Sequence, residues 1–566
     1  MGDVQLRGNG RKDGQPRRGG LRGALGGMVL LVALALATAA CGGGSPPATG
    51  GSPAGGAGGA AQGAGTIVDG LYEEPDLLNP TIGANMTYST LVELTMFPGL
   101  FTVDDHGRLI PDLATEVPTV QNGGISKDGL TYTFHLRDAK WSDGQPFTAQ
   151  DVDFTWRFIM NPKVAPRTTA GFDHIASSKM IDDHTIQFRL KEPFAPFASA
   201  WVAPLILPYH VFKDLSPDQY MTAAYNKAPT VTLGPFKFKE WKSGDHITVV
   251  ANPDFWRGAP KAKEIVFKII PDQNSLLAAM QSGEVNVYYF APITQLAQLK
   301  AIPGAQVVVH PQLAYESAVL NLRNPILQDV RVRQALEYGL DRDVLVKDVW
   351  KGMGTTVAGD QPPGSWAYDP GLKPLPYDPA KANQLLDEAG WKKGADGYRY
   401  KNGQQLKLTY STTAKNPWRA QTEQIAQAQW KQLGVNLQIR NYDATTYFGT
   451  ILPKGQFDIG EYMYTNAYDP YFGTQVQYAT GAPSNFGKYS NAKVDQLLAM
   501  QLRTPDQAQR KAIYAQLERI LAYEDPPALF YYSPMEIDVS RGIDGYKPGP
   551  VLPDTWNSWE WALKTK

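Results

Sequence analysis

The stretch that decides the fold runs from Ser126 to Trp156 and reads SKDGLTYTFHLRDAKWSDGQPFTAQDVDFTW. Residues 131–136 alternate apolar and polar side chains, which predicts a half-buried strand. Asp143-Gly144 suits a tight turn, and Thr148 suits the cap of a helix that begins near Ala149. A strand, a turn and a helix therefore follow one another within about thirty residues.

Strands and helices continue to interleave along the rest of the chain. Residues 185–190 (TIQFRL) alternate in the same way, and residues 435–439 and 529–532 are short apolar runs typical of buried strands. We therefore assign the fold class as α/β, in the sense of a mixed α+β protein.

Two helices carry start signals. Asp378 is an N-cap residue followed by a proline at the first helical position, and Gly390 is a stop signal. Residues 504–507 (TPDQ) have the spacing of a capping box with Thr504 as the cap. The apolar residues that follow recur on one helical face: Ile513, Leu517 and Ile520.

Size and composition narrow the function classes. A chain of 566 residues exceeds the size of one hydrophobic core, so we expect two or three packed lobes. Its net charge of -1 and pI near 6.7 argue against a nucleic-acid binder, which usually has a basic surface. The single cysteine excludes a disulfide within the folded part.

The first 41 residues resemble a bacterial lipoprotein signal peptide that ends at a lipidated Cys41. A cluster of arginines precedes the apolar run MVLLVALALA at 28–37, which is too short to span a membrane. Thr38 stands where the lipobox usually has Leu, so an ordinary secretory signal remains the alternative. We expect an exported protein, anchored to the cell membrane through Cys41. Residues 42–65 contain only Gly, Ala, Ser, Pro, Thr and Gln, which predicts a flexible tether.

The stretch from Ser126 to Trp156 resembles the signature of the family 5 extracellular solute-binding proteins, the peptide, dipeptide and nickel binders of ABC importers. Other segments along the chain carry the same resemblance: residues 74–80 (EPDLLNP), 111–114 (PDLA), 233–236 (LGPF), 252–256 (NPDFW), 329–336 (DVRVRQAL), 389–391 (AGW) and 489–491 (YSN).

The resemblance implies a two-lobed clamshell of the periplasmic-binding-protein type with an extra subdomain. The implied parts are lobe I at 66–92, 230–316 and 536–566, its inserted subdomain at 93–229, and lobe II at 317–535. A solute would be held between the lobes and presented to an ABC permease and its ATPase. We also expect a monomer that has no cofactor or metal and does not bind nucleic acid.

Ligand contacts follow from the same resemblance. Tyr72 and Glu73 match a first-lobe strand that pairs with a peptide backbone. The segment 457–470 (FDIGEYMYTNAYDP) resembles the family's "fDi…W…D…dP" pattern. Tyr464 stands at the Trp of that pattern, and Asn466 stands at the acidic residue that holds a ligand ammonium group. Asp469 precedes the proline and is kept as a candidate.

Further cleft candidates lie at expected strand or loop ends: Trp418, Arg419, Asn485, Phe486 and Tyr531. An amide at position 466 cannot equal the charge-assisted bond of a carboxylate, so a peptide with a free amino end is less favoured. The resemblance implies an oligopeptide or similar solute. An oligosaccharide or a metal chelate remains open as the ligand.

Enzyme motifs are missing from the sequence. It has no H-E-x-x-H, no Walker-type phosphate loop, no G-x-S-x-G elbow and no cysteine beyond Cys41. The seven histidines have no metal-ligand spacing. We therefore expect a binding protein rather than an enzyme, and a secreted hydrolase with two carboxylates is the alternative from another class.

Overall fold

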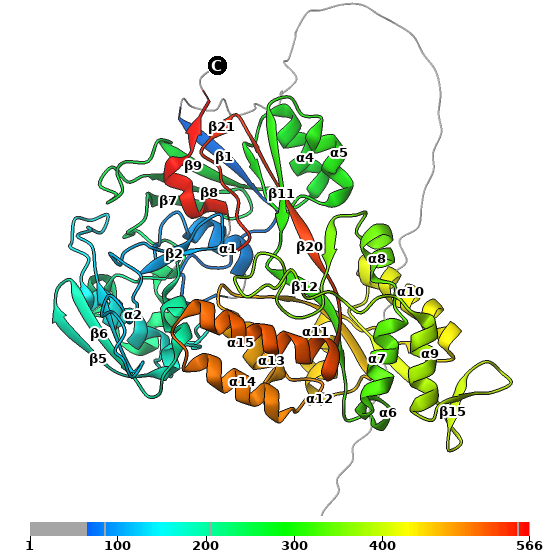
Figure 1. The fold of residues 1–566 in the computed structure, drawn as a ribbon. Coiled ribbons are helices and arrows are strands. Elements are labelled where there is room, and N and C mark those ends of the chain that lie inside the picture. The colour runs from blue at the N-terminus through cyan, green and yellow to red at the C-terminus, as the bar shows by residue number, and fades with distance from the viewer. Residues whose placement is uncertain (1–64, 84–85, 204, 552–553, 565–566) are drawn as a thin grey trace, which may run out of the picture. The chain divides into compact units, whose positions relative to one another are not determined.

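The structure is a computed structural model that describes residues 65–83, 86–203, 205–551 and 554–564 (Figure 1). Cys41 and all but the last residue of the expected tether lie outside these ranges, so lipidation remains a prediction. Within the described ranges, each helix is too short or too polar to cross a membrane.

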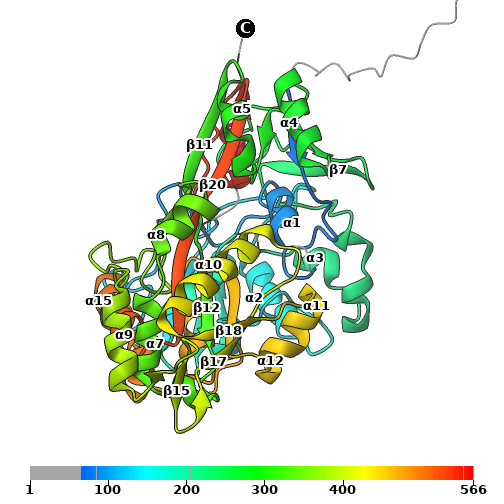
Figure 2. The ribbon, with the colours of Figure 1, turned by 90° about the vertical axis from the view of Figure 1, so that its right-hand side faces the viewer.

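One long strand, β20 (Ala528–Arg541), joins two parts of a twelve-stranded sheet. Its first half pairs with β12 (Ala314–Leu320) and β13 (Gly354–Thr356), and its second half pairs with β10 (Val287–Tyr288) and β11 (Ala305–Pro311). Figure 2 shows β20 running between these parts. The prediction at 529–532 found only the start of this strand.

The first part of the sheet continues from β10 through β1 (Thr66–Leu71), β9 (Glu264–Ile269), β8 (His246–Ala251) and β7 (Phe236–Lys242). Its two faces bury different side chains, because neighbouring residues of a strand point to opposite sides. One face packs against α4 (Gln273–Ser282) and α5 (Leu296–Lys300). The other face, which includes Ile67 and Leu71, packs against α1 (Met86–Glu93).

The second part contains β19 (Ile459–Thr465), β17 (Lys407–Ser411) and β18 (Asn436–Ile439), of which β17 is parallel to both neighbours. Two groups of helices contribute to separate buried clusters beside it (Figure 1). The first group is α7 (Val330–Tyr338), α9 (Pro379–Glu388) and α10 (Pro417–Leu433). The second group is α13 (Tyr471–Tyr478), α14 (Ala492–Leu502) and α15 (Gln507–Arg519).

A smaller sheet has its own core. It contains β4 (Thr131–His135), β6 (Thr185–Leu190) and β5 (Ile175–Asp182), and it packs with α2 (Ala149–Ile159) and the hairpin of β2 (Phe101–Val103) and β3 (Leu109–Pro111). The strand, the turn and the helix predicted from residues 126–156 are confirmed here. Gly144 has φ +88°, as a tight turn requires, and Thr148 caps α2 in a capping box with Asp151.

One of the two helix-start predictions needs a correction. Asp378 caps α9 and Gly390 has φ +87°, as predicted. At α15, however, the cap is Asp506, whose Oδ1 accepts from Gln509 N at 2.9 Å. Thr504 is not the cap, because its hydroxyl donates to Met500 O at the end of α14. The mixed α/β class is confirmed.

The remaining elements are short: α3 (Tyr209–Phe212), α6 (Pro325–Gln328), α8 (Arg342–Val344), α11 (Ala444–Thr446), α12 (Leu452–Lys454), β14 (Lys392–Lys393), β15 (Arg399–Lys401), β16 (Gln404–Gln405), β21 (Ile543–Asp544) and β22 (Ala562–Leu563).

Candidate functional site

The first group of predicted site residues follows the end of β1. Tyr72 is half-buried and packs against the cluster formed by α4, α5 and β20, whereas Glu73 is exposed. Tyr88 of α1 lies nearby: burial raises the pKa of its hydroxyl, and the charge of Glu73 raises that pKa further. The Tyr88 ring meets Phe290 edge-on at 5.9 Å. Glu73, Tyr88 and Phe290 therefore lie near one another, whereas Tyr72 packs against the cluster on the other face of the sheet.

Phe290 was not predicted from the sequence, and its backbone is unusual. Its φ of +53° is a conformation that a bulky residue rarely adopts. The backbone N–H of Phe290 donates to Asp538 Oδ1 of β20 at 3.0 Å, which holds this conformation. The strained residue therefore places an aromatic ring beside Tyr88.

The second group lies at the start of α10. Asn416 caps this helix by accepting from the backbone N–H groups of Trp418 and Arg419 at 3.0 and 3.1 Å. The Trp418 ring stacks on Trp350 with centroids 5.6 Å apart. Arg419 Nε donates to Glu316 Oε1 at 2.7 Å, which ties the helix start to β12. Both predicted residues are therefore held in fixed positions.

Two buried acidic side chains lie beside Arg419: Glu316 and Glu461, which come from neighbouring strands. Glu423, on α10 itself, accepts from Asn441 Nδ2 at 2.8 and 2.9 Å. Burial raises the pKa of Glu461, the charge of Glu316 raises it further, and Arg419 partly opposes both effects. Burial also raises the pKa of Glu423. One guanidinium faces two buried carboxyls, so the cluster favours an added proton or an added cation.

The third group follows β19. Tyr464 is half-buried, and its ring centroid lies 6.1 Å from that of Tyr315. Asn466 is buried, and its Nδ2 donates to the backbone carbonyl of Asp360 at 2.7 Å. Asp469 accepts from both terminal nitrogens of Arg510 at 2.7 Å. The Asp469 carboxylate is therefore already neutralised within the protein.

A cavity of about 870 Å³ lies beside Asp469. Its walls come from the small sheet and from the region of α13 and α15, and include Tyr132, Trp366 and Arg510. Two contacts bring these parts together: Leu109 N donates to the Tyr468 hydroxyl at 3.3 Å, and Ser199 Oγ donates to Asp469 Oδ2 at 3.5 Å. Only Asp469 among the predicted residues lines this cavity.

The last three predicted residues lie in packed surroundings. Asn485 is buried, and its Nδ2 donates to Ala479 O and Tyr489 O, which closes its own loop. Phe486 is half-buried and meets Tyr462 edge-on at 6.2 Å. Tyr531 is fully buried, with its hydroxyl 3.0 Å from that of Tyr410. In this conformation Tyr531 has no surface for a ligand.

Sequence reasoning missed several polar residues that the structure brings into these groups. Glu461 lies within the mainly apolar strand β19, and this unusual position is a signal that the sequence offers. Arg510 precedes Ile513 by three residues and Leu517 by seven, so it occupies the apolar face of α15. Glu316 lies within the mainly apolar strand β12 and offers the same signal, whereas Trp350 carries no comparable one.

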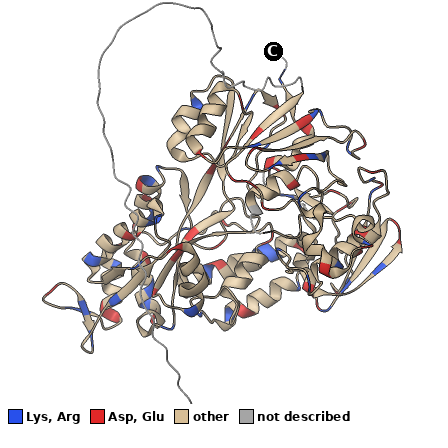
Figure 3. Cartoon of the chain, turned by 180° about the vertical axis from the view of Figure 1, so that it is seen from behind, with Lys and Arg blue, Asp and Glu red and all other residues tan. Residues whose placement is uncertain are grey.

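Acidic and basic residues are interspersed over the described part of the chain (Figure 3). This distribution agrees with the small net charge of -1. It gives no support to a nucleic-acid interface, which would gather Lys and Arg on one face.

Comparison with known proteins adds a family and relatives. Residues 108–485 match the bacterial extracellular solute-binding proteins, family 5 (middle part). The oligopeptide-binding protein AppA of Bacillus subtilis is 28% identical over 507 residues, which cover 86% of this chain and 92% of AppA. The glutathione-binding protein GsiB of Escherichia coli is 30% identical over 493 residues, which cover 84% of this chain and 90% of GsiB.

Solved structures show the same likeness. AppA from Bacillus subtilis in complex with a nonapeptide has a TM-score of 0.71 and 27% identity, covering 89% of this chain and 100% of that one. NikZ from Campylobacter jejuni in complex with Ni(L-His) has a TM-score of 0.73 and 27% identity, covering 88% and 100%. The predicted two-lobed fold class is confirmed by this likeness.

Proposed function

Because the chain belongs to family 5 of the bacterial extracellular solute-binding proteins, a family of binding proteins rather than enzymes, we propose that it captures an oligopeptide or a similar solute and delivers it to an ABC importer. AppA is named for oligopeptides and GsiB for glutathione, so peptide-like ligands are shared by these two relatives. The solute would bind between the two lobes, with lobe I, its inserted subdomain and lobe II divided as the sequence predicts.

The observation that carries this proposal is a pair of residue groups, one beside each of the two parts of the sheet that β20 joins. Tyr72, Tyr88 and Phe290 lie beside the first part, and Trp418 with Arg419 lies beside the second. Aromatic side chains on both sides suit an extended peptide, because they cover apolar and polar groups alike. The Arg419 cluster adds charged groups at one end.

Closure around the solute would bend the chain where β20 passes between the two parts. To move a mostly open population to a mostly closed one, a ligand must prefer the closed form by roughly 5 kcal/mol. Aromatic side chains buried on both sides of a peptide are a sufficient source of that difference.

The experiment has two steps. Mass spectrometry of the solute that copurifies with the full chain identifies the ligand class. Titration with that solute, and with peptide pools, is then followed by thermal unfolding and by small-angle scattering. We expect a rise in melting temperature together with compaction. A protein that copurifies with no solute and responds to no peptide pool refutes the proposal.

The ligand's amino end gives a sharper prediction. Asn466 replaces the acidic residue of the family pattern, and Asp469 is neutralised by Arg510. Acetylating the amino end of a bound peptide should therefore change the affinity by less than about threefold. Isothermal titration with the free and acetylated peptides measures this change. A loss of several kcal/mol would show that another carboxylate, such as Glu73, holds the ammonium group.

We also propose that Cys41 carries the lipid anchor of this extracellular binding protein. One acyl chain gives only marginal membrane binding, so stable anchoring near the importer needs more than one chain. The tether at 42–65 would then let the folded part reach the permease.

A further inference from the structure

Three buried carboxylates lie near one another beneath Phe290, on the face of the sheet that packs against α1. They come from different segments: Asp69 from β1, Asp538 from β20, and Asp554 from the 3₁₀ segment Asp554–Glu560. Their relative exposures are 0%, 0% and 2%. The proposed capture of a solute makes no use of this cluster.

Two of these carboxylates, together with His310, have donor atoms close enough to share one ion, whereas Asp69 lies outside this group. An Asp538 oxygen, an Asp554 oxygen and a ring nitrogen of His310 all lie within 4.8 Å of one another. His310 Nε2 is 2.7 Å from Asp538 Oδ2. The hydroxyl of Tyr289 donates to Asp69, and that of Tyr546 donates to Asp554. Each carboxylate is therefore held by a neighbour in a fixed orientation.

Strand register places Asp69 with the rest of this cluster. Asp69 pairs with Val287 of β10, and Val287 pairs with Ser540 of β20. Residues opposite each other in a sheet share a face, and so do Ser540 and Asp538, which are two apart on one strand. Asp69, Ser540 and Asp538 therefore point to the same side.

Two polar atoms on this face lack a partner. Asp69 Oδ1 and Ser540 Oγ are buried and have no hydrogen-bond partner among the described residues. Asp69 and Ser540 are 0% and 1% exposed. Buried polar atoms are rarely left without a partner, so these two atoms indicate that a bound group completes the site.

The charge of the cluster points to a cation. In the part of the chain that the structure describes, His310 is the only basic group paired with these carboxylates. Ionised carboxylates buried without a counter-charge are strongly unfavourable, and a bound cation removes that penalty.

We propose that Asp538 and Asp554 bind a hard divalent cation, with Ca²⁺ as the ion taken up outside the cell, and that the unpartnered oxygen of Asp69 on the same face turns to this ion. The carboxylate oxygens and the Ser540 hydroxyl are the donors that Ca²⁺ prefers. Ca²⁺ binds oxygen at about 2.3–2.6 Å, so two of its ligands lie up to roughly 5 Å apart. His310 orients Asp538 through its hydrogen bond. The ion would fasten the segment at 554–560 to β1 and β20, next to Phe290 at the proposed ligand site.

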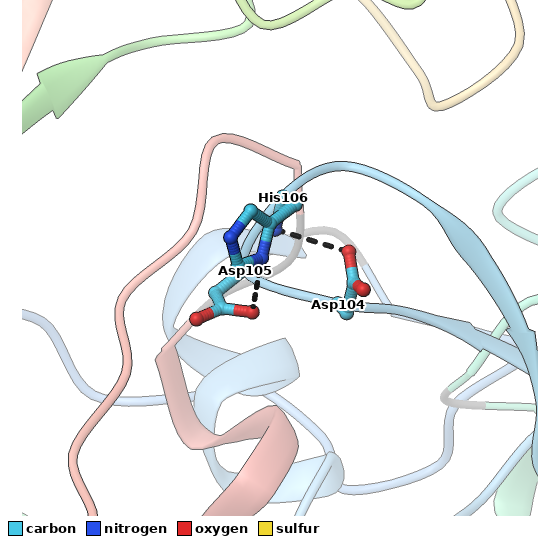
Figure 4. Close-up of side chains that lie close together, drawn as sticks. All are labelled: Asp104, Asp105 and His106. Atoms are coloured by element: carbon cyan, nitrogen blue, oxygen red, sulfur yellow. Dashed lines mark hydrogen bonds and ion pairs between the residues drawn. The ribbon is translucent and has the colours of Figure 1, made fainter.

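The other group of this kind, Asp104, Asp105 and His106, carries no such inference (Figure 4). These residues are consecutive in one turn, and the His106 side chain is 71% exposed. Asp104 is also occupied by Arg108, whose Nε donates to Asp104 Oδ2 at 2.8 Å. The turn therefore supplies a matched control position.

The test uses the full chain after treatment with a chelator. Tb³⁺ replaces Ca²⁺ at oxygen sites, and Tyr289 and Tyr546 are placed to sensitise its emission. We expect one equivalent of Tb³⁺ to give sensitised emission that added Ca²⁺ reverses, and Ca²⁺ to raise the melting temperature. Asp538→Asn and Asp69→Asn should each weaken Tb³⁺ binding by about tenfold or more, whereas Asp105→Asn should not change it.

Three results would overturn the proposal. The wild-type chain could give neither sensitised emission nor a Ca²⁺-dependent rise in melting temperature. Tb³⁺ could bind equally well to Asp69→Asn and Asp538→Asn, which would place the ion elsewhere. Zn²⁺ but not Ca²⁺ could displace Tb³⁺, which would refute the oxygen-ligand class. Should both variants fail to fold, equilibrium dialysis of the wild-type chain against Ca²⁺ decides, with one bound equivalent supporting the site and none refuting it.

Discussion

The ion pair between Asp469 and Arg510 allows a test of whether Asp469, a predicted site residue, stabilises the fold or binds the ligand. Its two parallel hydrogen bonds are both 2.7 Å long, and the side chains are 3% and 5% exposed. Arg510 also donates to Gln501 Oε1 at 2.7 Å and lies 5.0 Å from the centre of the Trp366 ring. The guanidinium therefore links α14, α15 and the loop after β19.

Arg510→Met keeps a long apolar side chain but leaves Asp469 buried without a cation. Removing one partner of a buried ion pair typically costs about 3–5 kcal/mol. Both residues belong to the proposed lobe II at 317–535. In a cooperative unit of about 150–250 residues, each kcal/mol of lost stability lowers the melting temperature by about 2–4 °C. We therefore expect a fall of about 6–20 °C. Asp469→Asn in the same background should restore part of this loss, since it removes the uncompensated charge.

Thermal and denaturant unfolding of the wild type, both single variants and the double variant form the assay. Peptide affinity is measured on the folded variants by calorimetry. Because Arg510 already occupies both Asp469 oxygens, Asp469→Asn should change peptide affinity by less than about threefold. The reasoning is refuted by strictly additive losses of stability. It is equally refuted when Asp469→Asn keeps the wild-type melting temperature but loses peptide binding, which would make Asp469 a ligand contact.

Three further predictions concern other parts of the chain. Thr148→Ala should lower the free energy of unfolding by about 1 kcal/mol, because it removes the capping box of α2, and a denaturant titration checks this. Glu461 has a raised pKa in the folded state, so above the unfolded value near 4.5 the unfolded chain loses its proton first and stability falls as pH rises. Glu461→Gln should not show this fall, so the melting temperature of the variant minus that of the wild type should increase as pH rises. A difference that stays constant between pH 4 and 8 would contradict the prediction. Cys41→Ser should release the protein into the medium of its host with unchanged peptide binding, and continued membrane retention would contradict lipidation.

The elements that sequence alone predicts are those whose cause is local. The strand at 131–135, the cap at Thr148 and the cap at Asp378 each depend on a few neighbouring residues. β20 shows the limit of this reasoning. After the apolar run at 529–532 comes Pro534, and then acidic residues at 536 and 538 alternate with apolar ones. This alternation is itself a strand pattern, but Pro534 separates it from the first run. That both runs form one strand follows from β10 and β11, which pair with its second half.

The candidate site residues likewise divide into those that local sequence indicates and those that depend on distant partners. Arg419 is recognisable because Asn416-Pro417 marks a helix start, but its partner Glu316 lies 103 residues away on β12. Tyr531 has the composition of a cleft residue and yet lies in the core, because β20 has helices on both sides at that point. Long-range pairing thus decides which polar and aromatic side chains lie together, and the sequence indicates only some of the individual residues.

The departure at Asn466 from the family pattern now has a structural cause. Its Nδ2 donates to the backbone carbonyl of Asp360, and a carboxylate at this position could not donate that hydrogen bond. The Asp360 side chain lies beside Glu518, whose pKa is raised first by burial and then by the charge of Asp360. An acidic residue at 466 would add another negative charge to this buried neighbourhood. The amide therefore holds the segment that leads to Trp366 at the cavity wall, and this structural role accords with the proposal that position 466 does not anchor a ligand ammonium group.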